Sequence, residues 1–125
     1  MISAETILIV EDNPLIASTV AMMLENELAY EAIIARSVAS ARALIDDRIR
    51  FAVLDVEVED GLTFSLALQL LRRNIPVVFA SGSDPGKMPS ELAPTPFLRK
   101  PVSLRDLVAA ARHRLSLHNF SCKYQ

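Results

Sequence analysis

The chain has 125 residues, of which 51% are hydrophobic, so it is long enough to bury the core of one domain spanning residues 1–125. Its 13 basic and 15 acidic residues give a formal net charge of −2 and form no basic cluster of the kind that binds nucleic acid. Residues 1–6 do not resemble a signal peptide, and no apolar run approaches the about 18 residues of a membrane span. The one cysteine, Cys122, permits no internal disulfide, which is typical of a reducing compartment. From these observations together we expect a cytoplasmic protein without membrane or nucleic-acid partners.

The first part of the chain alternates short apolar runs with helical patterns. Residues 7–10 and 30–35 are predicted strands, and Asn13 and Pro14 suit the N-cap and first turn of a helix between them. The predicted buried face of that helix is Leu15, Ile16, Thr19, Val20, Met23 and Leu24. Ser37 is the predicted N-cap of a second helix. Its predicted buried face is Val38, Ala41, Leu44 and Ile45.

The same alternation continues and then breaks. Residues 51–54 are the third predicted strand, 63–73 the third helix and 77–80 the fourth strand. Residues 82–95 contain three prolines and two glycines, which disfavour a long helix. The fourth helix is therefore predicted to be short, within residues 87–92, or absent, and more mobile than the rest of the domain.

The last part of the chain supplies a fifth strand and a final helix. Residues 97–98 are the short fifth run, and Ser103 with Asp106 resembles a capping box. The predicted buried stripe of the final helix is Leu104, Leu107, Val108, Ala111 and Leu115. Residues 119–125 are polar, and we expect them to be frayed.

Five apolar runs that alternate with helices indicate a parallel sheet covered on both faces. Right-handed crossovers then give a doubly wound α/β domain. In this architecture ligands bind beyond the carboxyl ends of the strands, so the residues that follow each run are the candidates for a site.

Polar residues with suitable chemistry follow four of the runs. Glu11 and Asp12 follow the first, Asp55 the third and Ser81 the fourth, and Lys100 lies just after the fifth. Three carboxylates repel one another without a cation, and oxygen ligands suit Mg²⁺. A metal that bridges a carboxylate and a phosphoryl group supplies positioning and charge neutralisation for phosphoryl transfer. Asp55 is the best candidate for a nucleophile that forms an aspartyl phosphate.

Each of these motifs alone is typical of an ordinary loop or turn. The functional interpretation depends on the order in which they follow one another along the chain, each at the end of a predicted strand. That order resembles the receiver domains of two-component response regulators over residues 6–117. The motifs that carry the resemblance are Glu11-Asp12, Asp55, Ser81 and Lys100-Pro101. The resemblance implies a flavodoxin-like sheet of five parallel strands in the order 2-1-3-4-5 and a Mg²⁺ cofactor. It also implies a protein that is not an enzyme beyond self-phosphorylation and slow self-dephosphorylation.

By this resemblance, Glu11 and Asp12 bind Mg²⁺, with Asp12 the more direct ligand. Asp55 is the phosphoacceptor and a further metal ligand, and Glu57 offers its backbone carbonyl to the metal. Lys100 contacts the phosphoryl group, and the peptide bond that joins it to the following proline is expected to be cis.

The resemblance also implies a switch. Ser81 is the switch hydroxyl and Phe97 the switch aromatic, which can turn inward when phosphorylation draws Ser81 away. The face formed by the fourth helix, fifth strand and fifth helix is where such domains usually form homodimers or meet partners. Residues 78–82 resemble the Phe-Ala-Thr-Gly motif of a branch of stand-alone alphaproteobacterial receivers, with Ser81 replacing the threonine.

Residues 56–61 depart from the family pattern, because this loop is acidic and lacks the usual proline. The implied partner is a sensor histidine kinase or a histidine phosphotransfer protein, and the downstream protein is not identified. One alternative is a hydrolase of the haloacid-dehalogenase type, which expects a second Asp where this chain has Glu57. Another is a flavodoxin-like FMN binder, which we disfavour because the acidic residues 11–12 would repel phosphate.

Overall fold

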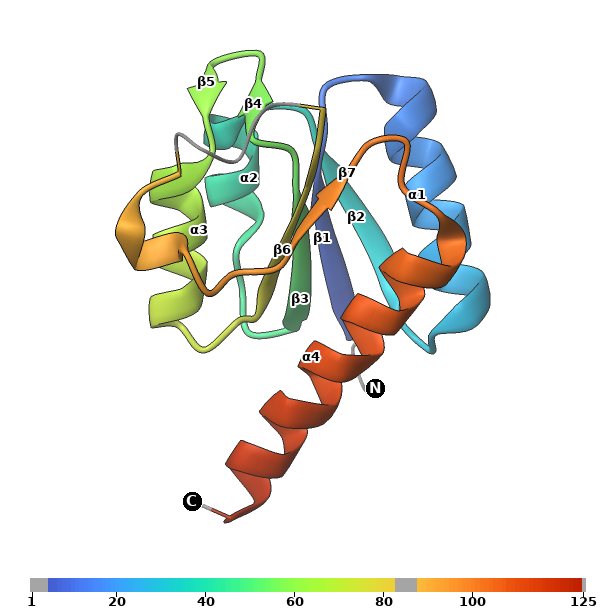
Figure 1. Ribbon diagram of the computed structural model, residues 1–125, viewed down its shortest axis with the longest axis vertical. Coiled ribbons are helices and arrows are strands. Elements are labelled where there is room, and N and C mark those ends of the chain that lie inside the picture. Colours follow the sequence, from blue (N-terminus) through green and yellow to red (C-terminus); the bar gives the residue numbers. More distant parts are fainter. Residues whose placement is uncertain (1–4, 83–87, 125) are drawn as a thin grey trace.

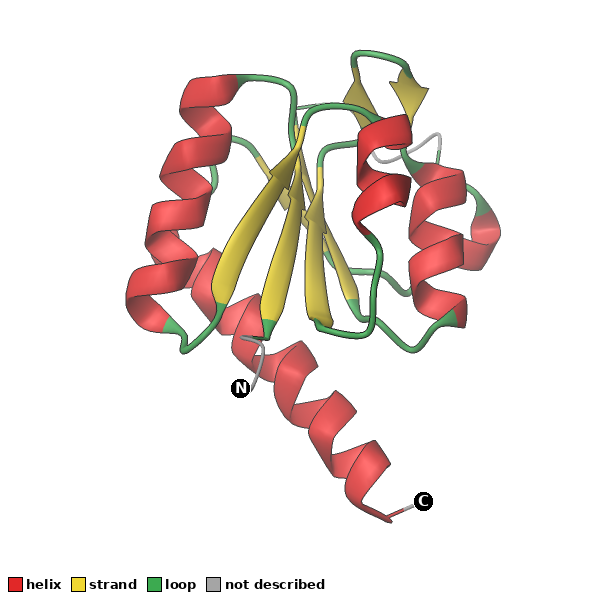
Figure 2. Ribbon diagram, turned by 180° about the vertical axis from the view of Figure 1, so that it is seen from behind, coloured by secondary structure: helices red, strands yellow, loops and turns green. Residues whose placement is uncertain are grey.

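The computed structural model describes residues 5–82 and 88–124, with only the backbone described for residues 117–124. A five-stranded parallel sheet forms its centre, and helices cover both faces (Figures 1 and 2). The strands are β1 (Thr6–Val10), β2 (Glu31–Ala35), β3 (Ile49–Leu54), β6 (Val77–Ser81) and β7 (Phe97–Arg99). Their order is β2-β1-β3-β6-β7. Because β6 and β7 are the fourth and fifth strands of the sheet, the predicted flavodoxin-like order is confirmed.

Strand β1 shows how the sheet divides the core into two layers. Its side chains alternate between the two faces. Ile7 and Ile9 belong to one buried cluster, and Leu8 and Val10 belong to the other. The helices of the first layer are α1 (Pro14–Glu27) and α4 (Leu104–Tyr124). Those of the second layer are α2 (Val38–Leu44) and α3 (Phe64–Arg72).

Three helices begin at the N-caps that the sequence predicted. The Asn13 side chain accepts hydrogen bonds from the backbone N–H groups of Leu15 and Ile16, the second and third residues of α1. Ser37 accepts from the N–H of Ser40, whose hydroxyl in turn accepts from the N–H of Ser37. Ser103 accepts from the N–H of Asp106. These side chains satisfy amides that have no partner inside the helix.

The predicted inner face of α1 is wrong in part. The helix buries Ala17, Ala21 and Leu24, whereas Leu15 is 74% exposed. The apolar periodicity predicts that the larger apolar side chains face the core. The small alanines face the sheet instead and let the helix lie close to it. Leu24 of the predicted face is buried, and Leu15, at the site end of α1, is left at the surface.

A small hairpin, which the sequence analysis did not predict, follows the third strand of the sheet. It consists of β4 (Glu57–Val58) and β5 (Gly61–Leu62) in antiparallel pairing. Asp60 at its turn accepts hydrogen bonds from the N–H groups of Val38 (2.7 Å) and Ala39 (3.0 Å). The hairpin therefore binds the N-terminus of α2, where a carboxylate is favoured by the helix dipole.

The predicted short fourth helix is confirmed for the residues that the structure describes. Between β6 and β7 these residues contain a single 3-10 turn, Ser90–Leu92. Leu92 is fully buried and anchors that turn in the core. Our expectations for residues 83–87, including their mobility, lie outside the described residues.

The final helix is longer than expected. The polar sequence predicts fraying over residues 119–125, whereas the backbone of α4 is helical to Tyr124, and Gln125 lies outside the described residues. Its last turns extend beyond the end of the sheet (Figure 2). Within the described ranges, no helix has both the length and the apolar character that crossing a membrane requires.

We predict that Asp60→Asn destabilises the protein in a pH-dependent way. Hydrogen bonds from the Val38 and Ala39 amides hold the pKa of Asp60 below its ordinary 3.8. A depressed pKa stabilises the fold above the unfolded value, and this contribution disappears as the pH falls through the folded value. The difference in free energy of unfolding between wild type and Asp60→Asn should be constant above about pH 5 and shrink toward about pH 3.

Urea unfolding at several pH values measures this difference. Glu59→Gln is the matched control, because among the described residues Glu59 forms an ion pair only with Arg36, at 3.4 Å, and both side chains are more than half exposed. Exposed pairs of this kind contribute little. An Asp60→Asn deficit that is as large at about pH 3 as at neutral pH would contradict the assignment.

Candidate functional site

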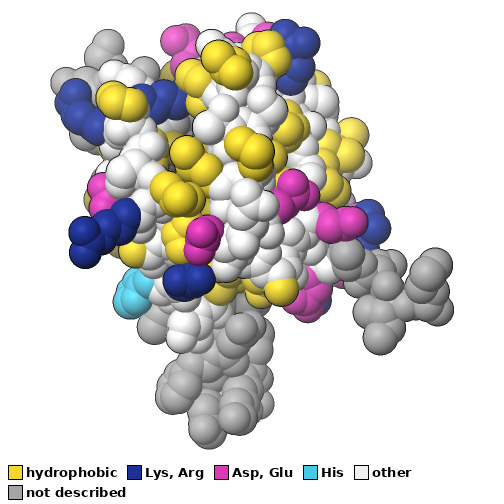
Figure 3. All heavy atoms as spheres, turned by 90° about the vertical axis from the view of Figure 1, so that its right-hand side faces the viewer, with side chains coloured by type: hydrophobic (Ala, Val, Ile, Leu, Met, Phe, Trp, Pro, Cys, Tyr) yellow, Lys and Arg dark blue, Asp and Glu magenta, His cyan; other side chains and the backbone are white. Residues whose placement is uncertain are grey.

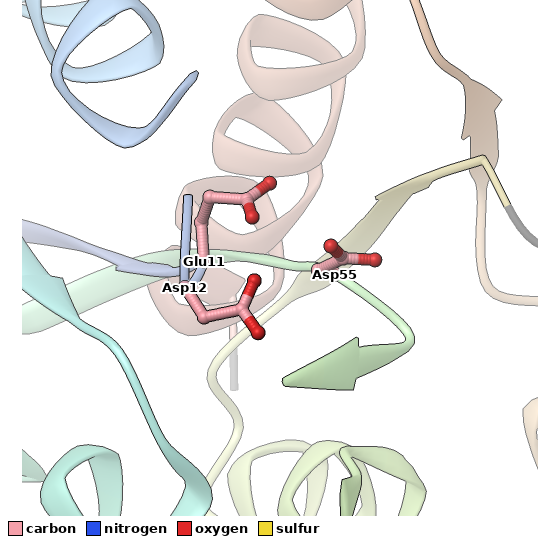
Figure 4. Close-up of side chains that lie close together, drawn as sticks. All are labelled: Glu11, Asp12 and Asp55. Carbon is pink, nitrogen blue, oxygen red and sulfur yellow. The ribbon is translucent and has the colours of Figure 1, made fainter. Parts of the chain in front are cut away.

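Three carboxylates meet at the carboxyl edge of the sheet. Val10 and Leu54 are partners in the β1–β3 register, so the residues that follow them emerge side by side. The N–H of Asp55 donates to the carbonyl of Val10 at 2.9 Å. Glu11, Asp12 and Asp55 each offer one carboxylate oxygen, and these oxygens lie within 4.8 Å of one another (Figure 4). The sequence-based prediction that these three residues converge is confirmed.

Lys100 brings a positive charge to the same place. It follows β7, and its ammonium donates to a carboxylate oxygen of Glu11 and to Oδ2 of Asp55 at 3.0 Å. Its backbone N–H donates to the carbonyl of Ser81 at 3.0 Å. The peptide bond between Lys100 and Pro101 is cis, as expected.

The protonation state of Lys100 follows from these contacts. Partial burial lowers the pKa of its ammonium, but the hydrogen bonds that it donates to Glu11 and Asp55 outweigh that effect, so the pKa lies above its ordinary 10.5. Lys100 is therefore charged at neutral pH. Its electrostatic contribution to stability is complete below about pH 10 and is lost as the pH rises through the raised pKa.

The two residues of the acidic pair have different surroundings. Glu11 is 5% exposed, and besides Lys100 it binds the N–H of Asn13 at 3.0 Å through Oε2. Asp12 is half-buried, and none of the described residues makes a hydrogen bond to its carboxylate. The carboxylate of Asp12 therefore keeps more of its coordinating capacity, while that of Glu11 is largely occupied by the protein.

The remaining predicted residues lie around this cluster. Ser81 is buried at the end of β6. Glu57 lies in β4 with an exposed side chain, and the role of its carbonyl stays a prediction. Phe97 is already half-buried against Phe79, with ring centroids 6.4 Å apart. The inward turn of Phe97 on phosphorylation therefore also stays a prediction.

Thr63 belongs to the site, although the sequence analysis took it only for the first residue of a helix. It is fully buried, and its hydroxyl donates to the backbone carbonyl of Asp55 at 2.6 Å. A threonine before a helical pattern is typical of an N-cap, so local sequence gave no sign of this contact.

A groove next to the carboxylates was also not predicted. It has a volume of about 490 Å³ and lies between α1 and the segment that joins β7 to α4. Its wall on α1 consists of Leu15, Ile16, Thr19, Val20 and Met23. Its opposite wall consists of Pro101, Val102 and Leu107, and Glu11, Asp55 and Lys100 also line it. Figure 3 shows that hydrophobic side chains gather on this face of the molecule.

No protein-family model matches the chain, and no curated protein matches it in sequence. Solved structures do match. SdrG from Sphingomonas melonis Fr1 is 37% identical with a TM-score of 0.73, and the match covers 92% of this chain and 98% of that one. A CheY-like response regulator receiver domain protein from Methanospirillum hungatei is 25% identical with a TM-score of 0.80, covering 95% and 99%. The non-phosphorylated HemR receiver domain from Leptospira biflexa is 24% identical with a TM-score of 0.76, covering 90% and 94%.

The chain belongs to the response regulator receiver family, whose members accept phosphoryl groups in two-component signalling. Receiver domains generally bind Mg²⁺ at an acidic pocket, and the oxygen-only cluster of Glu11, Asp12 and Asp55 fits that ion. They also interact in general with histidine kinases or phosphotransfer proteins. Membership of the branch with the Phe-Ala-Thr-Gly motif stays a prediction.

We predict that Lys100→Met makes the protein more dependent on Mg²⁺ for stability. Losing two charge-assisted hydrogen bonds should cost about 1–3 kcal/mol without metal. In this variant the carboxylates of Glu11 and Asp55 have lost the ammonium of Lys100, so a divalent ion would offset more of their mutual repulsion. The rise in Tm on adding MgCl₂ at constant ionic strength should therefore be larger for Lys100→Met than for wild type.

Arg50→Met is the control, because Arg50 pairs with the exposed Glu5, far from the cluster. Its Tm should respond to Mg²⁺ as wild type does. Equal Mg²⁺ responses of Lys100→Met and wild type would show that the ammonium and the cation do not share a site.

Proposed function

We propose that Asp55 accepts a phosphoryl group from the phosphohistidine of a sensor histidine kinase or histidine phosphotransfer protein. The convergence of three carboxylates and one ammonium at the carboxyl edge of the sheet carries this proposal. Three carboxylates so close together repel one another, so the cluster favours binding of a cation. The cation and the ammonium can in turn bind an anionic phosphoryl group. Asp55 is also 13% exposed at its side chain, which leaves an oxygen accessible to a donor.

The proposed step forms one bond and breaks one. A carboxylate oxygen of Asp55 attacks phosphorus, the P–N bond of the phosphohistidine breaks, and its electron pair stays on the imidazole nitrogen. The product is an acyl phosphate on Asp55 and a free histidine on the donor. Lys100, whose ammonium is 3.0 Å from Oδ2 of Asp55, is placed to move onto the phosphoryl oxygens.

The bound metal would neutralise the negative charge shared by the acceptor and the phosphoryl group. Asp12 and Asp55 are the proposed direct ligands, together with the backbone carbonyl of Glu57. Glu11, which is already bound to Lys100 and to the N–H of Asn13, would act through water. Ser81 would hold a phosphoryl oxygen, and its movement would be transmitted to Phe97 on the neighbouring strand, where Phe97 pairs with Phe79.

The donor would dock on the groove beside α1. A phosphohistidine must come within bonding distance of Asp55, and Asp55 and Lys100 are among the residues that line the groove. Its walls are apolar, and Leu15 on its rim is 74% exposed. Burying this side chain against a donor protein would stabilise the encounter complex in the orientation that transfer needs. A homodimer through the face of the turn Ser90–Leu92, β7 and α4 remains a separate proposal.

We predict that the protein gains one phosphoryl group from acetyl phosphate only when a divalent ion is present. Asp55→Asn keeps the shape of the side chain and removes the nucleophile, so it should gain none. Intact-mass spectrometry measures both, with EDTA as the metal-free control. Full labelling of Asp55→Asn would overturn the assignment. Continuous release of phosphate from acetyl phosphate, instead of slow turnover of a labelled protein, would favour the hydrolase alternative.

We predict that Leu15→Glu slows transfer from a phosphorylated histidine phosphotransfer domain at least about tenfold, because the variant places a charge on the apolar rim. Its labelling by acetyl phosphate, which needs no docking, should remain within about twofold of wild type. Leu62→Glu is the matched control, since Leu62 is a 54% exposed leucine on the hairpin and lies outside the groove. A Leu15→Glu variant that receives phosphoryl groups from the protein donor as fast as wild type would exclude the groove as the docking surface.

A further inference from the structure

Thr63 occupies an N-cap position without acting as an N-cap. It precedes α3, but its side chain makes no capping hydrogen bond. A capping residue usually has an extended backbone, which turns its side-chain oxygen toward the first amides of the helix. Thr63 has φ −96° and ψ 9° instead, and its side chain is 0% exposed. Its hydroxyl is therefore directed into the protein and away from the amides of its own helix.

The hydroxyl of Thr63 is directed at the acceptor. It lies 2.6 Å from the carbonyl oxygen of Asp55 and 3.2 Å from that of Val56. A hydroxyl has one proton, and the shorter distance lies within the usual range for an O–H···O hydrogen bond. The Asp55 carbonyl is thus the main acceptor. The backbone N–H of Thr63 donates to the Val56 carbonyl at 2.9 Å, which leaves the hydroxyl proton for Asp55.

Both backbone polar groups of Asp55 are consequently fixed. Its N–H binds the carbonyl of Val10 on β1, and its carbonyl binds Thr63. The direction of the Cα–Cβ bond, and with it the position of the carboxylate, follows from this backbone. The same contact closes the loop that contains β4, so it also sets where the carbonyl of Glu57 lies.

We propose that Thr63 is a positioning residue for phosphoryl transfer, which rests on the proposed role of Asp55 as acceptor. It orients the acceptor carboxylate and the loop carbonyl toward the metal and the incoming phosphorus. In-line transfer depends on such placement, and a misplacement of about 1 Å can cost about 10²-fold in rate.

A purely structural role is the competing explanation. A buried hydroxyl that satisfies a buried carbonyl stabilises any fold, and its loss lowers stability without touching the chemistry. The two explanations predict different properties for the fraction of a Thr63 variant that is still folded. A positioning role changes the Mg²⁺ affinity and the labelling rate of the folded protein, whereas a structural role changes only the folded fraction.

The chain offers a matched control for the test. Thr6 is another buried threonine, at 1% exposure, and its hydroxyl has no hydrogen-bond partner among the described residues. It lies at the opposite end of β1 from the carboxylates. Thr63→Val and Thr6→Val thus remove the same group, and Thr63→Ser restores the hydroxyl.

The experiment measures two quantities on full-length folded protein. The first is the second-order rate constant for labelling by acetyl phosphate at saturating Mg²⁺, with the label located on Asp55 by peptide mass. The second is the Mg²⁺ dissociation constant. Thr63→Val should label at least about tenfold more slowly and bind Mg²⁺ more weakly, while Thr63→Ser and Thr6→Val stay within about twofold of wild type. If Thr63→Val does not fold, Thr63→Cys keeps a weaker donor and should lie between the serine variant and the expected loss.

The outcomes separate the two proposals. Wild-type labelling and Mg²⁺ affinity in folded Thr63→Val, or equal losses in Thr63→Val and Thr6→Val, would overturn the positioning role and leave the acceptor assignment intact. A wild-type chain that carries no phosphoryl group on Asp55 would overturn the proposed function, and the role of Thr63 with it.

Discussion

The bridge from Lys100 to Glu11 and Asp55 is the interaction on which the site depends. Parallel strands bring three carboxylates together where water is partly excluded, and like charges at such distances repel. The ammonium of Lys100 offsets part of that repulsion, and it reaches the cluster from the edge strand β7, whereas the carboxylates follow β1 and β3. The order of the strands is therefore what allows the charges to coexist.

The ammonium does not neutralise the whole negative charge of the three carboxylates, and the charge that is left can bind a cation. Three carboxylates and one ammonium leave two formal negative charges, which a divalent cation can neutralise. A phosphoryl group added to Asp55 would bring more negative charge, which the metal and the ammonium can share. With a divalent cation bound, the acceptor would lie between two positive charges, the ammonium of Lys100 and the metal.

Sequence reasoning located the strand-end residues because an apolar run and the polar residue that follows it are adjacent in the chain. It missed the features that depend on distant or competing contacts. The inner face of α1 was set by the small size of Ala17 and Ala21, which apolar periodicity does not register. Asp60 binds α2 from more than twenty residues away, and Thr63 binds the acceptor instead of its own helix. No local pattern distinguishes such contacts from ordinary turns and caps.

The central claim is that the carboxylate cluster binds a metal and a phosphoryl group as one unit. A titration with beryllofluoride, a phosphoryl mimic, followed by the amide NMR signals of Asp55, Ser81 and Lys100, tests it most directly. With Mg²⁺ present, all three signals should move to new positions, and without Mg²⁺ none should move. Binding of beryllofluoride that is independent of Mg²⁺, or that leaves these amides unchanged, would contradict the account.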